Sequence, residues 1–469
     1  MRNRSKTAAK LRLGLTGAVG AACIAWALTP SLARAQTLSD ALAAAYLNNP
    51  TLLSSRASLR ATDEEVPQAL ANWRPEVTVN ADYGFSQITN SRNAGSNINQ
   101  TRHPHSADVT VSQSLFRGGR TLAAVSEAEN NVRAARANLM ETEQTVLLEA
   151  VTAFVNVFRD IAVLNLNTNN EQVLKRQLEA TRDRFQVGEI TRTDVHQAEA
   201  RLAKAVADRI QSEGDLEISK ANYENVVGEA PPPQLQPAAL PVGLPDTRDD
   251  TLKVAATKNP AVIAAEFNRR AAIDSADSTY GELLPEVSLD ASVSRSFESA
   301  AESGRNYTES LTLNLKVPIY QQGTVYSQLR EARQTVAQQT LTIDQERRDA
   351  VEAAAQAWES LLTARARVKA FFTQIEANVV ALEGVQREAA VGSRTVLDVL
   401  DAEQELLDSR VSHVRAQRDE LVASYQVLSA IGKMTARDLG LGLTLYDPRE
   451  HYNEVRDKWF GGTSQGGEQ

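Results

Sequence analysis

Two aspartates in the last fifth of the chain have a type and spacing that could support chemistry. Asp398 and Asp401 are three positions apart, so in a helix they share one face near its start. Such a pair would concentrate negative charge on that face of the helix. For Asp398 a structural role is an equal alternative, because Thr395-x-x-Asp398 has the pattern of a capping box in which the carboxylate meets the helix dipole. For Asp401 the alternative is a solvated surface charge.

Two common signatures of enzymes are missing. The sequence has no G-x-x-x-x-G-K-[S/T] phosphate loop and no H-E-x-x-H zinc motif. Its five histidines are scattered, and the pair His103 and His105 in a polar stretch is weak support for a metal site. The 59 acidic residues are distributed as on solvated helix faces. We therefore expect no catalytic activity, no cofactor and no metal site.

The first 35 residues have the composition of a secretory signal peptide. They begin with basic residues, continue with an apolar stretch from Leu13 to Leu28, and end with an A-x-A cleavage site at Ala33–Ala35. The apolar stretch is shorter than the ~20 residues that a spanning helix needs, which disfavours a membrane anchor. The one cysteine, Cys23, lies inside this stretch and lacks the preceding aliphatic residue of a lipidation site. Cleavage would leave a chain without cysteine.

The charge of the chain disfavours one class of partner. The net charge is −9, and loss of residues 1–35, which carry six basic and no acidic residues, changes it to −15. A protein this acidic does not bind nucleic acid through charge alone. No later segment has the apolar run of a spanning helix, so a mature chain in a membrane would have to use β-strands.

The chain contains an internal duplication. Short landmarks recur in the same order, first 210 and then 204 positions apart, with one six-residue slip in a loop. The halves differ at one site of interest, because the counterpart of Asp401 is Gln197. The matched landmarks are Asn49-Pro50 with Asn259-Pro260, Pro75-Glu76-Val77 with Pro285-Glu286-Val287, Val187-Gly188 with Val391-Gly392, and Asp194-Val195 with Asp398-Val399.

Each half should contain two long helices. Residues 120–187 and 324–383 have neither Gly nor Pro and are rich in residues that favour helix. At 1.5 Å per residue, such a run makes a rod of about 100 Å. Second helices should follow as far as Gly228 and Gly432. The alanine-rich stripes of these helices must be buried against other helices. Alone, they would favour an ordinary helical bundle or a coiled-coil stalk, such as a structural coiled-coil protein of the cell envelope.

Alternating segments that precede the helices predict β-hairpins at about 75–116 and 285–319. Apolar side chains alternate there with hydroxyl, amide or charged ones, around a polar loop at 91–105 in the first hairpin. A period of two over about ten residues suits strands that face lipid on one side and water on the other. A soluble amphipathic hairpin has the same pattern. Four strands cannot close a membrane barrel, whose minimum is about eight, so a membrane-spanning chain must oligomerise.

The strand–helix junctions and the glycine-centred helix turns resemble those of the TolC-like outer-membrane channels, which serve efflux and type I secretion. The junctions are Ser114–Gly119 and Val317–Gly323, and the most specific turn segment is Val391–Glu403. The resemblance runs from about Leu38 to Gly440. It implies an α+β membrane protein that forms a homotrimer. Four strands per chain would build a 12-stranded outer-membrane β-barrel, continued by long antiparallel helices as a periplasmic α-barrel.

The resemblance also implies a function and a set of partners. We expect a passive, water-filled conduit in the outer membrane of a Gram-negative cell, gated at its periplasmic end, for small-molecule efflux or type I protein secretion. Substrate would arrive from an inner-membrane transporter, ABC or proton-driven, through a periplasmic adaptor protein. The other partners would be two further copies of the chain and outer-membrane lipid, with no nucleic acid. The remaining alternative is the structural coiled-coil protein without a pore.

The resemblance assigns gate roles near the helix turns. Asp398 and Asp401 match the family's aspartate pair at the periplasmic entrance, where three copies would place six carboxylates that attract cations and raise one another's pKa. Arg394 matches the gate arginine, whose partners on the neighbouring subunit would be Thr193 and Asp194.

Two further features of the turns follow from the same resemblance. Gly188 and Gly392 match the helix tips that contact the adaptor, although each could serve only as a turn glycine with positive φ. The family's tyrosine three residues before the gate glycine is replaced by Ala389, so one expected closing contact is missing.

The predicted domain organisation has five parts. Residues 1–35 form the signal peptide, 36–228 the first repeat and 251–432 the second. A Pro-rich linker covers 229–250, and 433–469 hold an equatorial segment with a Gly/Ser/Gln-rich tail that we expect to be disordered. Residues 36–72 and 229–280 are further candidates for the equatorial region around the long helices.

Overall fold

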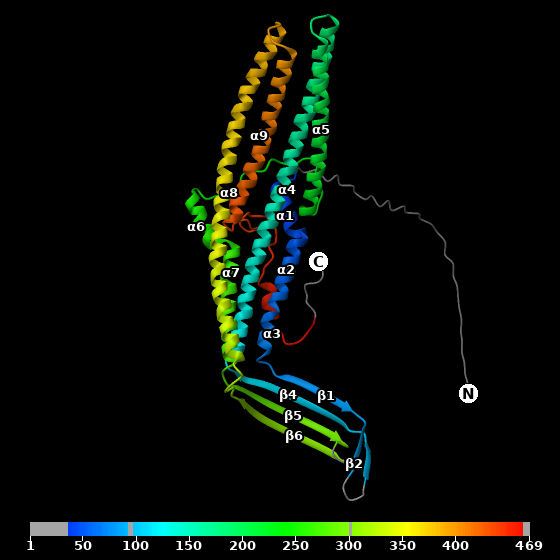
Figure 1. Ribbon diagram of the computed structural model, residues 1–469, viewed down its shortest axis with the longest axis vertical. Helices are drawn as coiled ribbons and strands as arrows, with labels where there is room; N and C mark the ends of the chain where they lie inside the picture. The colour runs from blue at the N-terminus through cyan, green and yellow to red at the C-terminus, as the bar shows by residue number, and fades with distance from the viewer. Residues whose placement is uncertain (1–35, 92–96, 300–302, 463–469) are drawn as a thin grey trace, which may run out of the picture.

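The computed structural model describes residues 36–91, 97–299 and 303–462. These residues form an elongated, mostly helical molecule that ends in an antiparallel sheet (Figure 1). The expected signal peptide with Cys23, and the end of the expected disordered tail from residue 463, lie outside the described residues.

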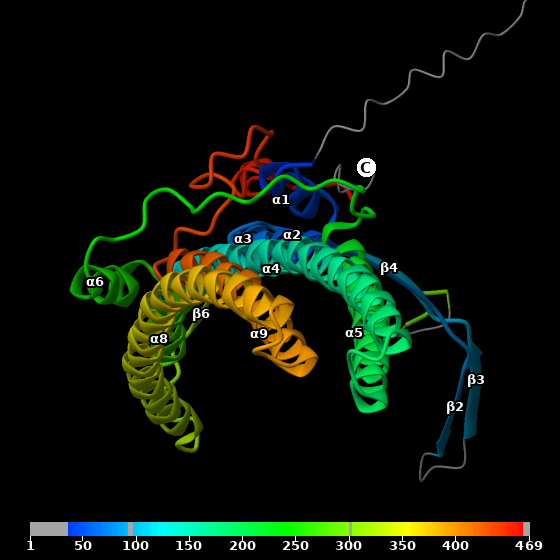
Figure 2. The ribbon, with the colours of Figure 1, turned by 90° about the horizontal axis from the view of Figure 1, so that it is seen from above.

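Four long helices form the tall part of the molecule. α4 (Arg120–Gln186) and α8 (Thr324–Ala390) have 67 residues each, and α5 (Arg192–Val227) and α9 (Val396–Ala430) return beside them. Seen from above, the four stand along a curved wall with a concave face (Figure 2). α9 contacts both α8 and α4, so the two helix pairs form one wall. In the described ranges, no helix is both long and apolar enough to cross a bilayer.

Shorter helices thicken the middle of this wall, within the regions that we expected to be equatorial. α1, α2, α3 and the C-terminal helix α10 lie on the convex side (Figure 2). α7 packs between α4 and α8, and the segment from 229 to the start of α6 crosses the convex side without a helix. Their bounds are α1 Leu38–Asn48, α2 Pro50–Asp63, α3 Glu65–Ala71, α6 Arg248–Lys258, α7 Pro260–Gly281 and α10 Glu450–Val455.

The apolar core lies where α1 and α2 cover the middle of α4 and the ends of α5 and α9. Phe154 of α4 and Tyr223 of α5 are fully buried, with ring centroids 6.5 Å apart. Small residues beside them, such as Ala150 and Ala153, are also fully buried and let the helices approach closely. The alanine-rich stripes of the long helices are therefore buried here, as the composition required.

The repeated Asn-Pro pair makes the same contacts in both halves. Asn49 caps α2 by accepting the backbone N–H of Thr51 at 2.9 Å, and its amide donates to the carbonyl of Val226 at the end of α5, also at 2.9 Å. Asn259 caps α7 and donates to the carbonyl of Ala430 at the end of α9 at 3.2 Å. Each asparagine thus joins the start of one helix to the end of another, and Pro at the first helical position suits this geometry.

Four strands form one antiparallel sheet in the order β1-β4-β5-β6. They are β1 (Glu76–Tyr83), β4 (His105–Arg117), β5 (Glu286–Phe297) and β6 (Arg305–Lys316). Their register turns the alternation in the sequence into two faces, because neighbouring positions point to opposite sides. An apolar row of Val77, Val111, Ala291 and Leu311 adjoins a hydroxyl row of Thr78, Thr110, Ser292 and Ser310.

The expectation of a polar loop at 91–105 was wrong in part. β2 (Ser86–Ser91) and β3 (Asn97–Arg102) pair as a separate antiparallel hairpin beyond the main sheet. The pattern of apolar residues missed this hairpin because its strands are rich in Ser, Thr, Asn and Gln, with isoleucine alone as a large apolar residue. Backbone hydrogen bonds, which any side chain permits, build it.

Candidate functional site

The two helix turns at the end far from the sheet hold the candidate gate (Figure 1). Gly188 follows α4 with φ +82°, and Gly392 follows α8 with φ +80°, so both are turn glycines in the left-handed region. The N–H of Glu189 bonds back to the carbonyl of Arg184, and the N–H of Ser393 bonds to that of Glu388, each at 3.0 Å. These bonds close the helix ends.

A matching cap begins the second helix of each pair. The carboxylate of Asp398 accepts the backbone N–H of Thr395 at 2.9 Å and its hydroxyl at 2.8 Å, and Thr395 accepts the N–H of Asp398 at 3.2 Å. Thr191 and Asp194 make the same reciprocal contacts at the start of α5. Both aspartates therefore cap a helix, which is the role that the local sequence pattern predicted for Asp398.

The cap also changes the acidity of Asp398. Hydrogen bonds from the backbone N–H and the hydroxyl of Thr395 hold the pKa of Asp398 below its ordinary value, and the charge of Arg394 acts in the same direction. Mutual repulsion among neighbouring copies would raise this pKa. A raised pKa of Asp398 in the assembled ring stays a prediction, and the hydrogen bonds of the cap act in the opposite direction.

Asp401 has a partner from the other half of the chain. Nη2 of Arg201 in α5 donates to Oδ1 of Asp401 in α9 at 2.5 Å, and both side chains are partly exposed. The contact joins the ends of the two helix pairs. Asp401 is therefore neither a lone surface charge nor an unpaired carboxylate within one chain.

Within a single chain, Arg394 pairs with a residue other than its expected partners Thr193 and Asp194. Nε of Arg394 donates to Glu388 in the last turn of α8 at 2.9 Å, and the ion pairs of the described residues include none between Arg394 and Asp194. Thr193 is exposed. Ala389, where the family has tyrosine, is buried under the turn.

A buried carboxylate lies below the second turn and was missed at the sequence level. Glu403 in α9 is almost fully covered, and its Oε2 has no hydrogen-bond partner among the described residues. Burial raises the pKa of Glu403, while a hydrogen bond with Gln386 opposes the change. Its position two residues after Asp401 turns it away from the exposed face, which only the packed helices reveal.

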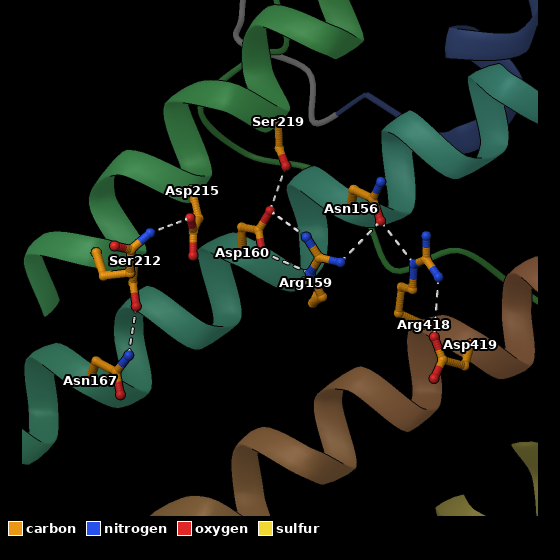
Figure 3. A network of polar contacts seen from close by, with 10 residues as sticks. Asn156, Arg159, Asp160, Asn167, Ser212, Asp215, Ser219, Arg418 and Asp419 are labelled. Atoms are coloured by element: carbon orange, nitrogen blue, oxygen red, sulfur yellow. Dashed lines mark hydrogen bonds and ion pairs between the residues drawn. The ribbon is translucent and has the colours of Figure 1, made fainter. Parts of the chain in front are cut away.

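A chain of polar contacts crosses three helices near the middle of α4 (Figure 3). Arg159 holds Asp160 with two contacts of 2.7 and 2.8 Å, and the hydroxyl of Ser219 in α5 donates to the same carboxylate at 2.5 Å. Nε of Arg418 in α9 donates to Oδ1 of Asn156 at 2.8 Å, and Arg159 donates to that oxygen at 3.3 Å. The network ties α9 to α4 and α5.

This network was also missed, although the sequence carries a signal for it. Asn156, Asp160 and Asn167 recur at helical spacing within a part of α4 that is rich in Val, Leu, Ile and Phe. Asn167 is buried and donates to the buried hydroxyl of Ser212 in α5 at 2.6 Å. Because a buried polar group needs a partner, such a row indicates a polar seam between helices. A cleft of about 540 Å³ opens beside it.

Metal binding finds no support in the described part of the chain. No three His, Cys, Asp or Glu side chains there are placed to hold an ion together. His105 instead stacks on Phe297 across the sheet, with ring centroids 4.7 Å apart.

Comparison with known proteins decides the family. The family model described as outer membrane efflux protein matches residues 41–229 and 251–433, which together make up most of the chain and follow its two halves. The chain belongs to the outer membrane efflux protein family. The resemblance to TolC-like channels is thereby confirmed.

Individual members of the efflux protein family match the chain over nearly its whole length. Outer membrane efflux protein BepC of Brucella suis biovar 1 is 36% identical over 437 residues, covering 92% of this chain and 93% of the relative. Outer membrane protein TolC of Escherichia coli (strain K12) is 26% identical over 426 residues, covering 87% and 85%. The solved structure of the outer membrane protein VceC from Vibrio cholerae has a TM-score of 0.72 at 19% identity, covering 84% of this chain and 96% of that one.

Family membership fixes the cellular location. The chain is a Gram-negative outer-membrane protein with a large periplasmic part, and the relatives named above are outer-membrane proteins rather than enzymes. The long helices carry ion pairs and amide networks, which is consistent with an aqueous periplasmic environment. The sheet has one apolar face, which is consistent with contact with lipid.

Proposed function

We propose that three copies of this chain assemble into a passive, water-filled export channel. The sheets would join into one 12-stranded barrel in the outer membrane, and the twelve long helices would form a tapering periplasmic tunnel. The single observation that carries this proposal is the sheet, which combines an exposed apolar face with two open edges.

The apolar face needs a cover that one chain does not supply. Val79 of β1 and Leu311 of β6 are 71% and 72% exposed. Leu313 and Leu315 lie on the same face of β6 and are 65% and 66% exposed. Exposing a valine or leucine side chain to water costs about 1.5–3 kcal/mol relative to burying it. Lipid around the sheet would remove this cost for each of these residues.

The open edges call for further copies of the chain. β1 and β6 are the edge strands of the sheet, so each leaves a row of unpaired backbone groups. Such groups cost several kcal/mol each in hydrocarbon, which is why membrane sheets close into barrels. Pairing β6 of one copy with β1 of the next would satisfy both edges and make a closed ring. The number three rests on the family.

The curved wall supports a tunnel. Four helices of one chain already follow an arc with a concave face (Figure 2), and three such arcs would enclose a lumen. Internal duplication explains why the two helix pairs and the two hairpins repeat. A stalk without a pore would need neither the curvature nor the sheet, so the structural coiled-coil alternative is the weaker one.

The helix tips would form the gate and the docking site. Asp398 and Asp401 of three copies would surround the periplasmic entrance as a ring of negative charge. Arg394 would leave Glu388 to bond Thr193 and Asp194 of the neighbouring copy when the entrance closes. The tips at Gly188 and Gly392 would contact a periplasmic adaptor, and their neighbours Val187 and Val391, which are 72% and 81% exposed, supply apolar surface for it.

Assembly and conductance test this proposal together. The channel should migrate as a heat-resistant trimer in gels, fractionate with the outer membrane and give stable single-channel currents in planar bilayers. A monomer without conductance would support the coiled-coil alternative instead.

The cargo requires a separate experiment, because a wide aqueous tunnel has little chemistry tuned to one solute. We propose small-molecule efflux or type I protein secretion, with an ABC or proton-driven transporter behind the adaptor. A deletion strain should become sensitive to toxic compounds in the first case and lose a secreted protein in the second. If neither phenotype appears, both assignments are wrong.

A further inference from the structure

Several large aromatic side chains remain exposed near the base of the sheet, and three of them are Trp73, Trp459 and Phe460. Trp73 precedes β1 and is 56% exposed, while Trp459 and Phe460 follow α10 and are 58% and 87% exposed. Side chains of this size are normally covered in a folded protein, and an exposed group of them marks a surface that contacts something else.

The C-terminal segment is held in place rather than loosely attached. Val455 of α10 is buried, and Tyr452 packs on the small apolar cluster of Val66 and Val132. Beyond α10, Arg456 lies 3.8 Å from Glu129 of α4. The aromatic residues are therefore presented in a defined position.

One arginine connects this segment to the start of the sheet. Nη1 of Arg74 donates to the carbonyl of Lys458 at 2.8 Å, and its guanidinium lies over the ring of Trp459, 4.8 Å from the centroid. Arg74 is two residues before β1, and the carbonyl of Trp73 accepts from Gln113 of β4 at 3.0 Å. The contacts place the end of the C-terminal segment at the level where the strands begin.

The two overall views agree on where this segment faces. Figure 1 shows it beside α3, next to the point where β1 starts. Figure 2 shows it on the convex side of the helix wall, opposite the concave face. On this side and at this level, a chain whose sheet is inserted would meet the surface of the bilayer.

We propose that Trp73, Trp459 and Phe460 dock on the phospholipid surface of the periplasmic leaflet of the outer membrane. The C-terminal segment would then be a second, peripheral membrane contact of each chain, in addition to the strands. Trp is enriched at membrane interfaces, because its ring is amphipathic and sits at the level of the headgroups.

Continuity with the sheet favours lipid over another protein as the occupant. The exposed apolar row of the sheet begins at Val77, four residues after Trp73, and Leu115 and Phe116 of β4 are exposed at the same end. A surface that borders lipid on one side needs no separate partner to cover it. Because the mature chain is acidic, the contact must depend on the aromatic rings rather than on net charge.

Site-directed spin labelling tests the proposal and separates it from the proposed function, on which it rests. The full chain would carry Cys23→Ser and one further substitution, Phe460→Cys, and would be labelled with a nitroxide in phospholipid nanodiscs. Leu313→Cys on the apolar face of β6 is the lipid control, and Val391→Cys at the far helix tip is the water control. Collision with oxygen reports lipid, and collision with a water-soluble nickel chelate reports water.

The expected result is an oxygen-to-nickel collision ratio at position 460 that is severalfold above that at 391. A ratio at 460 equal to that at 391, with 313 in lipid, would overturn the docking proposal alone. A water-like ratio at 313 would instead overturn the insertion of the sheet. Low collision with both reagents at 460 would mean that protein covers the residue, which also contradicts the proposal.

Tryptophan fluorescence supplies an independent readout that does not depend on a label. In nanodiscs with lipids brominated close to the headgroup, Trp459→Phe should remove part of the quenchable emission. Trp358→Phe, which removes a buried ring from α8, should remove none of it. Equal quenching of wild type and Trp459→Phe would contradict the proposal.

Discussion

Arg201 and Asp401 are 200 positions apart in the chain and form an ion pair at the ends of the long helices, with Nη2 2.5 Å from Oδ1. The repeat counterpart of Asp401 is Gln197, so the duplication does not supply a second copy of this pair. A guanidinium that holds one of the two entrance aspartates reduces the negative charge available to a passing cation. The proposed ring of six carboxylates then has a smaller net negative charge than six unpaired carboxylates would have.

Replacing Arg201 should therefore strengthen cation block of the channel. In Arg201→Gln, the charge of Asp401 is no longer offset by a guanidinium, and the concentration of a trivalent cation that halves the single-channel current should fall severalfold. Planar-bilayer recording with the cation on the periplasmic side measures this. Arg182→Gln is the matched control, because Arg182 pairs with Glu199 at 2.7 Å near the same end. Equal shifts in both variants would mean that only net charge matters.

Removal of the aspartate pair should have the opposite effect. Asp398→Ala combined with Asp401→Ala should weaken block by at least tenfold, because the charges that concentrate the cation are gone. The control is Glu405→Ala with Asp408→Ala, which has the same spacing two turns further along α9. Since the Thr395 cap lowers the pKa of Asp398, block in the wild type should persist throughout the neutral pH range. Unchanged block in the Asp398/Asp401 variant would refute the ring.

The double role of Asn49 predicts a graded loss of stability. Asn49→Ala removes the cap of α2 and leaves the buried carbonyl of Val226 without its donor, which together should cost about 2–4 kcal/mol. Asn49→Ser keeps a cap but is too short to reach Val226, so its cost should be intermediate. Denaturant unfolding followed by circular dichroism gives the free energies. Asn169→Ala, at an exposed position of α4, should stay within about 0.5 kcal/mol of the wild type.

Glu143 predicts a pH-dependent gain in stability. Burial raises the pKa of this carboxyl, although the N–H of Ala436, at 2.7 Å, and the charge of Arg56 oppose the change. A raised folded-state pKa means that the native state binds the proton more tightly than the unfolded chain, so ionisation destabilises the fold at neutral pH. Glu143→Gln keeps the acceptor for Ala436 and should unfold at a higher temperature than the wild type.

The pH dependence of that gain distinguishes this explanation from a general effect of the substitution. The difference in unfolding temperature should shrink as the pH falls through the raised pKa of Glu143 toward the ordinary glutamate value of 4.5, because the wild type is then protonated too. Thermal scans across this range give the measurement. Glu376→Gln on the exposed face of α8 should show no such trend. A gain that is constant with pH would contradict the argument.

Features that depend on near neighbours in the chain were predictable from the sequence. The runs without Gly or Pro set the long helices, and the helix caps join residues only two or three positions apart, as in Asn49 with Thr51 and Thr395 with Asp398. The strand alternation likewise predicted two faces, because successive side chains point to opposite sides whatever the strand pairs with. The resemblance to TolC-like channels also rested on local landmarks and their repeat.

Features that depend on which segments meet were decided only by the tertiary structure. The partner of Asp401 is 200 positions away, the hydroxyl that bonds Asp160 is 59 positions away, and Arg74 reaches a carbonyl 384 positions away. No local pattern in the sequence names the two groups that each of these contacts joins. A polar side chain finds its partner only after the helices have packed, since its own flanking residues place no constraint on what lies across the interface.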